Sequence, residues 1–597
     1  MQRYACICGF DLSRIVDSCT SVGARRGGDD MVRSFDESGR QTVTLPTGQR
    51  VHEGHAAQSD VLTAKFEEVR KGVWNLVGNG LSNQTFIEAP EGIIAIDSGE
   101  SIEEMREALR RLREMVTAPI AAVIYTHFHY IEGTKAIFEE GNHVSPLPIY
   151  GHEKIGFNKA RTLAEISPAY ARGIVEQFAV VMPTEGPDAT VNVGLGFFYK
   201  NPAHAPYTPG YVPVTHALGE KATLSIAGMA VYAVHSPSDS DDSINFYFPE
   251  IGTCVHNSVW PVLFNVFAIR GEEYRDPRVL IPGIDNIIKW APEYLVCTHG
   301  PALKGKDDIR EKATRYRDSI QYMWDQTVRG INKGWTMDQV AHRVVLPDLY
   351  EVDYLTSERY GVTEHHVRQI YSGLRGFYDG DESKLFPLEP EERYGKLVQG
   401  FGGRAEVAAQ CEKALVGNDL RWAIELGTWL VRSAGATTQE RNLLATCLRV
   451  LAERTSAANI RNWAITRARH LDGSFPMDRF MTHNFNPKFM GEASAVGVVH
   501  TLRVLLEPSK VVGINHHVAF SIGDETCGLH IRNCVAVPTD GWGATSLVTM
   551  SRDVFIAIVS GKKLWSESTA VGDVKISGDV EMVNRIRLAF DNKGIAS

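Results

Sequence analysis

The sequence predicts three consecutive kinds of structure, which are a layered α/β part, an all-helical part and a small α+β part. Three observations support this fold class. Buried strand patterns alternate with an amphipathic helix between residues 61 and 308. Helical periodicity then dominates residues 309–472, and strands mixed with helices return over 473–597. The length of 597 residues agrees with several folded units, since one unit typically has ~100–200 residues.

Composition narrows the class of protein. The chain is 44% apolar and 22% charged, which is ordinary for a globular protein. Acidic residues outnumber basic ones by 72 to 62, so we expect no broad nucleic-acid surface. The nine scattered cysteines contain no Cys-x-x-Cys and favour reduced thiols. No apolar run reaches the ~18 residues that span a bilayer, and no secretory leader is evident, so we predict a cytoplasmic protein with no membrane span.

The α/β part follows an extension, residues 1–60, that has little periodicity. Strands are predicted at 73–77, 84–88 and 92–97, the last ending in Asp97. Ser101 with Glu104 forms the pattern of a capping box, and a helix of regular apolar spacing follows. A second buried strand, 120–125, leads directly into Thr126-His127-Phe128-His129. Further strands are expected at 222–226, 231–235, 244–249 and 294–300, each ending beside polar side chains.

The later parts have different patterns. Amphipathic helices are predicted at 309–333, 337–345, 404–416, 419–433 and 438–454. Beyond residue 473 we expect a helix over 492–506, strands over 511–522, 526–537 and 545–550, and a final helix over 578–590.

The most specific chemical feature is the pair His127 and His129 after a buried strand. Two imidazoles two residues apart on a loop can bind one metal ion, although such pairs also occur by chance on surfaces. Context strengthens the metal interpretation. His299 follows another buried strand, and the acidic loop 236–242 lies between two strands, so separate strand ends are expected to converge.

Several motifs resemble the alkylsulfatases of the metallo-β-lactamase superfamily, and the resemblance extends over residues 60–597. The segments that carry it are 80–88, 123–129, 245–250, 270–271, 275–276 and 298–299, with 318–322, 325–327, 360–365, 376–380 and 419–423 in the helical part. The resemblance implies a metallo-β-lactamase-like αββα catalytic domain at 61–308 and a helical dimerisation domain at 309–472. It also implies a C-terminal domain similar to sterol carrier proteins at 473–597, and a homodimer.

The family's metal motif, His-x-His-x-Asp-His, is altered here, because the chain reads His127-Phe128-His129-Tyr130-Ile131-Glu132. Ile131 has no ligand atom, whereas Glu132 can offer oxygen in place of imidazole. By resemblance, His127, His129 and Asp239 hold a first ion, with Asp241 or Asp242 as alternatives to Asp239. Glu132, His256 and His299 would form a second site, with Asn257 as the alternative to His256.

Two chemical interpretations follow, and a third remains open. One or two zinc ions would lower the pKa of a bound water towards ~7 and support hydrolysis. Two histidines with one carboxylate also suit iron, and a carboxylate-richer second site suits iron or manganese, which would support redox or lyase chemistry. The third interpretation is a metal-poor homologue that binds lipid.

The expected substrate is a hydrophobic molecule with an anionic group, a sulfate ester or a related ester. By resemblance, His365 and Arg368 would bind the sulfate, and with Glu132 they are the predicted catalytic side chains. Asn83 and Asn265 match family positions near the pocket, but each could equally hold a turn. Trp260, Pro261, Val262 and Phe264 stand where the family has polar residues, which predicts a more apolar pocket. In the C-terminal part we expect an apolar tunnel or a packing module, and a structural role for His516, His517 and His530.

Overall fold

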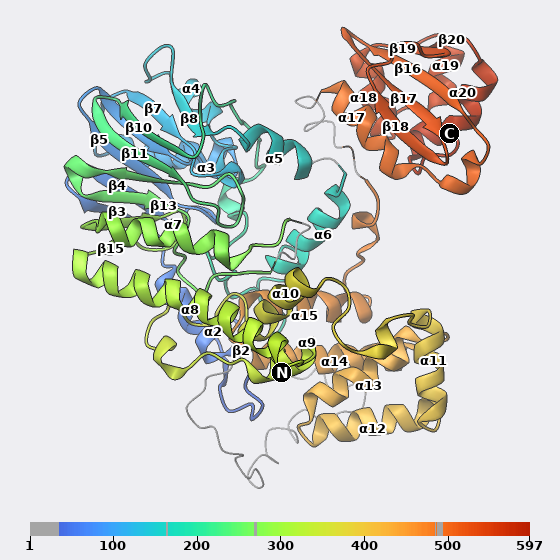
Figure 1. The fold of residues 1–597 in the computed structure, drawn as a ribbon, viewed down its shortest axis with the longest axis horizontal. Helices are drawn as coiled ribbons and strands as arrows, with labels where there is room; N and C mark the ends of the chain where they lie inside the picture. The colour runs from blue at the N-terminus through green and yellow to red at the C-terminus, as the bar shows by residue number, and fades with distance from the viewer. Residues whose placement is uncertain (1–34, 163–164, 268–271, 484, 486–493) are drawn as a thin grey trace. The chain divides into compact units, whose positions relative to one another are not determined.

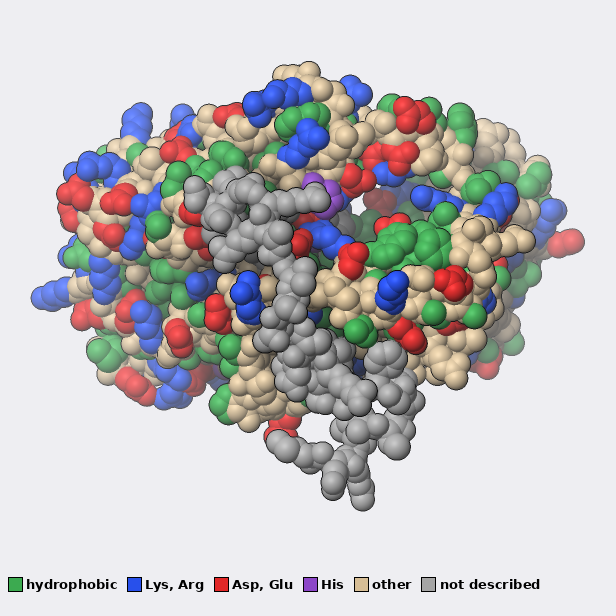
Figure 2. Space-filling model, turned by 90° about the horizontal axis from the view of Figure 1, so that it is seen from below, with side chains coloured by type: hydrophobic (Ala, Val, Ile, Leu, Met, Phe, Trp, Pro, Cys, Tyr) green, Lys and Arg blue, Asp and Glu red, His purple; other side chains and the backbone are tan. Residues whose placement is uncertain are grey.

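A computed structural model of the chain describes residues 35–162, 165–267, 272–483, 485 and 494–597 (Figure 1). The chain divides into two compact units, one formed by Met1–Gly156 with Gly173–Pro476 and the other by Phe157–Arg172 with Met477–Ser597. No helix in the described part of the chain is long and apolar enough to cross a membrane. On the face that Figure 2 shows, basic and acidic side chains are interspersed and form no single basic area.

Two mixed β-sheets form the centre of the first unit. The first sheet has seven strands in the order β3 to β9, and the second has six in the order β10 to β15. The strands of the first sheet are β3 (Lys65–Arg70), β4 (Val73–Val77), β5 (Gln84–Ala89), β6 (Gly92–Ile96), β7 (Ile120–Ile124), β8 (Ile149–His152) and β9 (His216–Leu218). Those of the second sheet are β10 (Lys221–Ile226), β11 (Met229–His235), β12 (Ile244–Phe248), β13 (Thr253–His256), β14 (Tyr294–Cys297) and β15 (Leu303–Lys304). β6 to β9 run parallel to one another, as do β13 and β14.

The sheets pack face to face and carry helices on their outer faces. Buried residues such as Ile94 and Ile124 of the first sheet meet Phe246 and Val296 of the second. Helices α3 (Ile102–Arg113) and α4 (Lys135–Glu140) cover the first sheet. Helices α7 (Pro277–Trp290) and α8 (Lys306–Asn332) lie along the other side of the sandwich (Figure 1). This order of layers confirms the predicted αββα fold.

The start of α3 confirms one half of the predicted capping box. Ser101 Oγ accepts a hydrogen bond from Glu104 N at 3.2 Å, as a capping serine does. The reciprocal arm is absent, because Glu104 Oε2 accepts from Glu100 N at 3.1 Å and Oε1 accepts from Gln84 Nε2 at 2.7 Å. The carboxylate is buried in this network, and a buried carboxylate needs such donors.

Helices make up most of the remainder of the first unit. They are α9 (Met337–Arg343), α10 (Thr363–Arg375), α11 (Pro390–Gly400), α12 (Arg404–Val416), α13 (Leu420–Arg432), α14 (Thr438–Arg454) and α15 (Ala458–Leu471). The predicted helical segments match α8, α9, α12, α13 and α14, whereas α10, α11 and α15 were not among them. Before β3, a hairpin of β1 (Thr42–Thr44) and β2 (Arg50–His52) leads into α2 (Glu53–Val61).

The second unit is α+β, as predicted. Its sheet has the order β18-β17-β16-β19-β20 and packs with α17 (Ala495–Thr501), α18 (Arg552–Val559), α19 (Trp565–Ala570) and α20 (Val580–Arg587) around one apolar core. The strands are β16 (His516–Ile522), β17 (Glu525–Arg532), β18 (Val535–Thr539), β19 (Ser546–Met550) and β20 (Lys575–Ser577). The single strand predicted over 526–537 is wrong, because the chain turns there. Asn533 and Cys534 have φ values of 50° and 62°, the left-handed conformation that a two-residue hairpin turn requires.

Candidate metal centre

Two neighbouring strands of the first sheet end at one polar cluster. β7 leads into Thr126 and the fully buried His127, and a 3₁₀ turn over Phe128–Tyr130 then carries His129. Asp97 follows β6 and holds the start of this loop. Its carboxylate accepts from Thr126 N at 2.8 Å and from Thr126 Oγ1 at 2.7 Å. Burial raises the pKa of Asp97 to about 6, against the opposing effects of His127 and Thr126.

The loop between β11 and β12 brings Asp239 to the two histidines. Asp239 Oδ2 lies 2.9 Å from His129 Nδ1, and Oδ1 lies 3.5 Å from His127 Nε2. One ligand atom from each residue lies within 4.8 Å of the others, and no other such group of three exists among the residues that the structure describes. Of the carboxylates that the sequence left open, Asp239 is therefore the one that converges with His127 and His129.

Strong electrostatic coupling accompanies this geometry. Burial opposes ionisation of Asp239, but the two histidines outweigh it and hold the pKa of the carboxyl well below its usual range. Burial likewise lowers the pKa of His129, but Asp239 and Glu272 outweigh that effect and raise it to about 9. Without a metal, the chain therefore favours a proton where a cation would bind.

Hydrogen bonds determine which nitrogen of His127 is available to a metal. The hydroxyl of Thr126 has one proton, which it donates to Asp97, so it accepts from His127 Nδ1–H at 2.9 Å. The Nε2 atom then carries the lone pair. It is buried and has no hydrogen-bond partner in the described part of the chain. Two imidazoles and a carboxylate, with one nitrogen left unsatisfied, fit a divalent ion such as zinc.

Asn257 supports Asp239. The Trp260 indole N–H donates to Asn257 Oδ1 at 3.0 Å, which fixes the orientation of the amide. Asn257 Nδ2 then donates to Asp239 Oδ1 at 2.6 Å. The other two acidic candidates point elsewhere, since Asp241 pairs with Lys154 at 2.9 Å and Asp242 accepts from Ser240.

The residues predicted for a second ion are not brought together in the same way. His256 Nδ1 accepts from Ser258 N at 3.0 Å and from Val259 N at 3.3 Å, so its Nε2 carries the hydrogen. His299 Nδ1 donates to Leu81 O at 3.0 Å, and its Nε2 lies 3.3 Å from the Tyr130 hydroxyl. Burial lowers the pKa of His256 to about 3 and that of His299 to about 4, which keeps both rings neutral.

Glu132 lies with a different set of neighbours. Its backbone N donates to Gly99 O at 3.0 Å. Its carboxylate is close enough to Tyr125 and Tyr211 to contribute to the raised pKa of both phenols. Ile131 is fully buried in the apolar cluster that α3 covers. Neither side chain therefore belongs to the group of ligand atoms that converges at His127, His129 and Asp239.

His365 and Arg368, predicted for the substrate, lie on α10 beside a more deeply buried histidine, His366. Arg368 pairs with Asp338, and His365 is only partly buried. His366 is fully buried, with neither ring nitrogen bonded to any described residue. A Cβ placed on Gly361 would lie 2.5 Å from His366 Nε2 and 3.2 Å from Asn265 Oδ1, so both atoms pack closely against Gly361. His366 shares the buried face of α10 with Ile370. The four-residue spacing of these two positions is visible in the sequence and indicates that they lie on one face of a helix.

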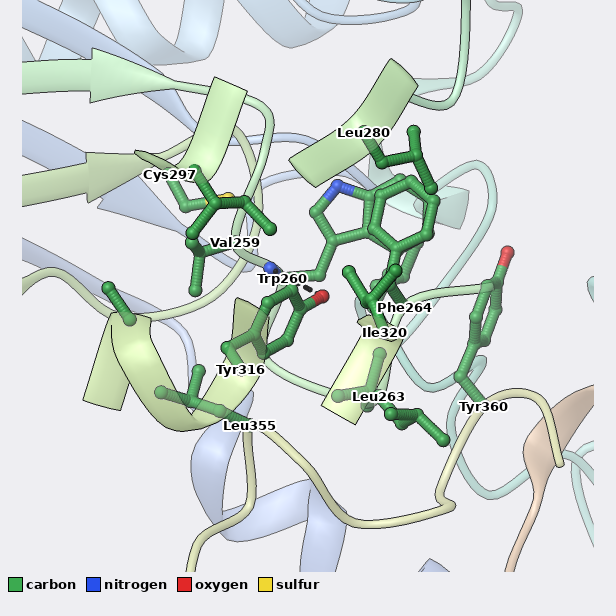
Figure 3. Packing of buried hydrophobic residues seen from close by; sticks show 14 of the residues in the cluster. Val259, Trp260, Leu263, Phe264, Leu280, Cys297, Tyr316, Ile320, Leu355 and Tyr360 are labelled. Atoms are coloured by element: carbon green, nitrogen blue, oxygen red, sulfur yellow. Dashed lines mark hydrogen bonds between the residues drawn. The ribbon is translucent and has the colours of Figure 1, made fainter. Parts of the chain in front are cut away.

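Asn83 and the apolar loop have structural roles. Asn83 Nδ2 donates to Cys297 O at 2.9 Å and to Gly300 O at 2.7 Å, so it holds a turn. Trp260 packs against Phe264 and Tyr316, and its backbone N donates to the Tyr316 hydroxyl at 3.1 Å (Figure 3). Trp260 and Phe264 are 1% exposed, and Val262 is fully buried. These three side chains belong to the core beneath α7 and α8. Pro261 instead lines a small cavity with His256 and His299, and the expected apolar character of the substrate pocket stays a prediction.

The αββα sandwich with a His-x-His pair at a strand end defines a metallo-β-lactamase-type fold. Comparisons with known proteins make the assignment narrower. A family model described as alkyl sulfatase dimerisation matches residues 336–474. The chain is 30% identical to a linear primary-alkylsulfatase of Pseudomonas sp. (strain ATCC 19151) over 522 residues, which are 85% of this chain and 98% of the relative. The chain therefore belongs to the alkylsulfatase family.

Other relatives agree. An alkyl/aryl-sulfatase of Saccharomyces cerevisiae is 25% identical, covering 90% of this chain and 84% of its own. An (R)-specific secondary-alkylsulfatase of Pseudomonas sp. is 26% identical, with 88% and 80% covered. The structure of a stereoselective inverting sec-alkylsulfatase from Pseudomonas sp. matches with a TM-score of 0.78 at 22% identity, over 97% of this chain and 94% of that one. This last likeness confirms the fold.

Proposed function

We propose that the protein hydrolyses sulfate esters of hydrophobic alcohols with one zinc ion per chain, held by His127, His129 and Asp239. The observation that carries the proposal is the convergence of these three side chains, with the His127 Nε2 lone pair unsatisfied. The names of the relatives, linear primary-alkylsulfatase and (R)-specific secondary-alkylsulfatase, support the ester class.

When bound, a zinc ion supplies Lewis-acid chemistry that polarises an ester oxygen and acidifies water. The protein supplies orientation. Asp97 and Thr126 fix the tautomer of His127, and Asn257 holds the Asp239 carboxylate. Burial holds the pKa of His366 well below its usual range, so the neutral ring has one N–H to donate. We assign His366 to a sulfate oxygen, in place of the predicted His365 and Arg368.

We also propose a homodimer formed through the helical part. The match to a dimerisation family covers residues 336–474. The same range exposes large apolar side chains, Phe377 at 83% and Phe386 at 98%, and exposed apolar clusters mark interaction sites. Size-exclusion chromatography with light scattering should give a dimer for the full chain and a monomer for a Phe377→Asp, Phe386→Asp variant.

The function is tested with protein purified without chelators or added metals. Elemental mass spectrometry should find about one zinc per chain. Inorganic sulfate should be released from a linear primary alkyl sulfate, and no phosphate from the matching alkyl phosphate. Release should stop after chelation and return with Zn²⁺. Sulfate release that persists in fully metal-free protein would contradict the proposal.

An iron or manganese redox or lyase enzyme is the second candidate, because two histidines and one carboxylate also form the ligand set of non-haem iron. Elemental analysis that finds iron, with oxygen-dependent turnover, would favour it. A metal-poor, lipid-binding homologue is the outcome if little of any metal binds. We also propose that the protein is cytoplasmic.

A further inference from the structure

His129 is held by a carboxylate on each side of its ring. Asp239 Oδ2 lies 2.9 Å from Nδ1, and Glu272 Oε1 lies 2.8 Å from Nε2. The side chains of both acids are about 95% buried, with exposures of 4% and 5%. An imidazole binds a metal through a nitrogen that carries no proton, so one of these two contacts must take the ring N–H.

Glu272 is itself fixed in place by Arg275. The guanidinium donates from Nη2 to Glu272 Oε2 at 3.0 Å. It also donates from Nε to Asp239 O at 3.2 Å and from Nη1 to Asn265 O at 2.9 Å. One buried arginine therefore ties Glu272 to the backbone of the loop that carries Asp239. Because both oxygens of Glu272 are engaged, the carboxylate cannot turn away from His129 without losing a charged hydrogen bond.

We propose that Glu272 is a positioning residue for the metal centre, and this inference rests on the proposed metal site. The carboxylate accepts the Nε2–H of His129 and thereby leaves the Nδ1 lone pair on the side where Asp239 and the His127 Nε2 atom lie. A carboxylate behind a metal-binding histidine fixes both its tautomer and its ring orientation.

In this proposal a carboxylate that accepts a ring N–H orients each of the two histidines, in one case through a hydroxyl and in the other directly. His127 Nδ1–H reaches Asp97 through the Thr126 hydroxyl, whereas His129 Nε2–H reaches Glu272 directly. Glu272 is not among the three groups whose ligand atoms converge in the described part of the chain. Its effect on a metal therefore passes through His129, which distinguishes a positioning role from that of a fourth ligand.

The test compares Glu272→Gln with Glu273→Gln, its exposed neighbour, in the full chain. Arg275 donates to position 272, so it selects the amide rotamer that presents oxygen to Arg275 and NH₂ to His129. That rotamer demands a lone pair on Nε2 and places the ring proton on Nδ1. We expect Zn²⁺ affinity, measured by competition with a chromophoric chelator, to fall ~10–100-fold in Glu272→Gln and to stay within twofold in Glu273→Gln.

The Co²⁺-loaded protein provides a readout that a general loss of stability would not move. We expect the visible absorption of the bound cobalt to change in Glu272→Gln, and Glu272→Asp, which keeps the carboxylate, to restore part of both affinity and spectrum. The same two measurements on Glu272→Asp decide the question if Glu272→Gln does not fold. Unchanged affinity and spectrum in Glu272→Gln, while His129→Ala loses its metal, would overturn this role alone. Retention of metal by His129→Ala would instead overturn the proposed site.

Discussion

Two groups of histidines occupy the same edge of the sandwich and differ in what their nitrogens bind. In the first group, one ring nitrogen of His127 and one of His129 donate their hydrogens away from the shared carboxylate of Asp239. The other ring nitrogen of each histidine faces Asp239. In the second group, backbone groups engage one nitrogen of each ring of His256 and His299. His299 also donates its Nδ1–H to a carbonyl, so a satisfied tautomer alone does not distinguish the groups. The difference lies at the other nitrogen, which faces the Asp239 carboxylate in His127 and His129 and the Tyr130 hydroxyl in His299.

The pKa values of one histidine from each group, His129 and His256, shift in opposite directions. Nearby carboxylates raise the pKa of His129 to about 9, whereas burial with no opposing charge lowers that of His256 to about 3. The first group attracts a cation through its carboxylates. We expect one metal ion per chain, although the family pattern suggested a second, because His127, His129 and Asp239 form the one group of converging ligand atoms among the described residues.

Removing the shared carboxylate should have the largest effect on this comparison. Asp239→Asn takes one of three ligands from the proposed site, so Zn²⁺ affinity should fall by more than the ~10–100-fold typical of a supporting residue, and sulfate release should fall with it. Asp241→Asn is the matched control, because that side chain pairs with Lys154. Loss of metal in Asp241→Asn with retention in Asp239→Asn would reverse the assignment.

The second largest effect is expected at His366, the residue that we assign to the substrate. A hydrogen bond to a charged group contributes about 1.5–3 kcal/mol, so His366→Gln should lower kcat/KM for an alkyl sulfate by roughly 10–100-fold with no change in metal content. The same measurement on His365→Gln should change less than threefold. A larger loss in His365→Gln would restore the histidine that the sequence first suggested.

Acid should lower the free energy of unfolding through His256, a member of the second group. The folded chain holds His256 at a pKa of about 3, below the ordinary value of 6.5, so the unfolded chain binds a proton first as pH falls. Neutral His256 therefore contributes to the free energy of unfolding, and this contribution is complete above pH 6.5. It is lost as pH falls towards 3, by about 1.4 kcal/mol per pH unit.

The measurement is urea unfolding of metal-free protein at pH 7.5 and 5.5, for the natural chain and for His256→Asn. Asn removes the titrating group and keeps an acceptor for Ser258 N, so the stability gap between the two proteins should narrow by about 1.4 kcal/mol at the lower pH. An equal pH dependence in both proteins would show that His256 titrates normally in the folded state.

The smallest effect is expected at His299. Because its nitrogens contact Leu81 O and the Tyr130 hydroxyl, His299→Gln should keep about one zinc per chain, with less than a twofold change in affinity. Elemental analysis after zinc saturation measures this. Two zinc ions in the natural chain and one in His299→Gln would restore the two-metal interpretation.

Much of the fold was predictable from local pattern. Continuous apolar runs located the buried strands β6 and β7, and the polar segment directly after β7 placed His127 and His129 at a strand end. The segment 526–537 was misjudged because its turn, Asn533-Cys534, has no glycine to mark it. Glu272 carried no signal either, since its spacing from His129 along the chain says nothing of their 2.8 Å contact.

By itself the sequence determined the layered fold, the His-x-His pair and the set of acidic candidates, because strand periodicity and short spacing are local properties of the chain. The tertiary structure decided which nitrogens are free. His299 is bound by a carbonyl 218 residues away, and His129 by a carboxylate 143 residues away. A metal site depends on lone-pair directions, and groups that are remote in sequence set those directions once the chain has folded.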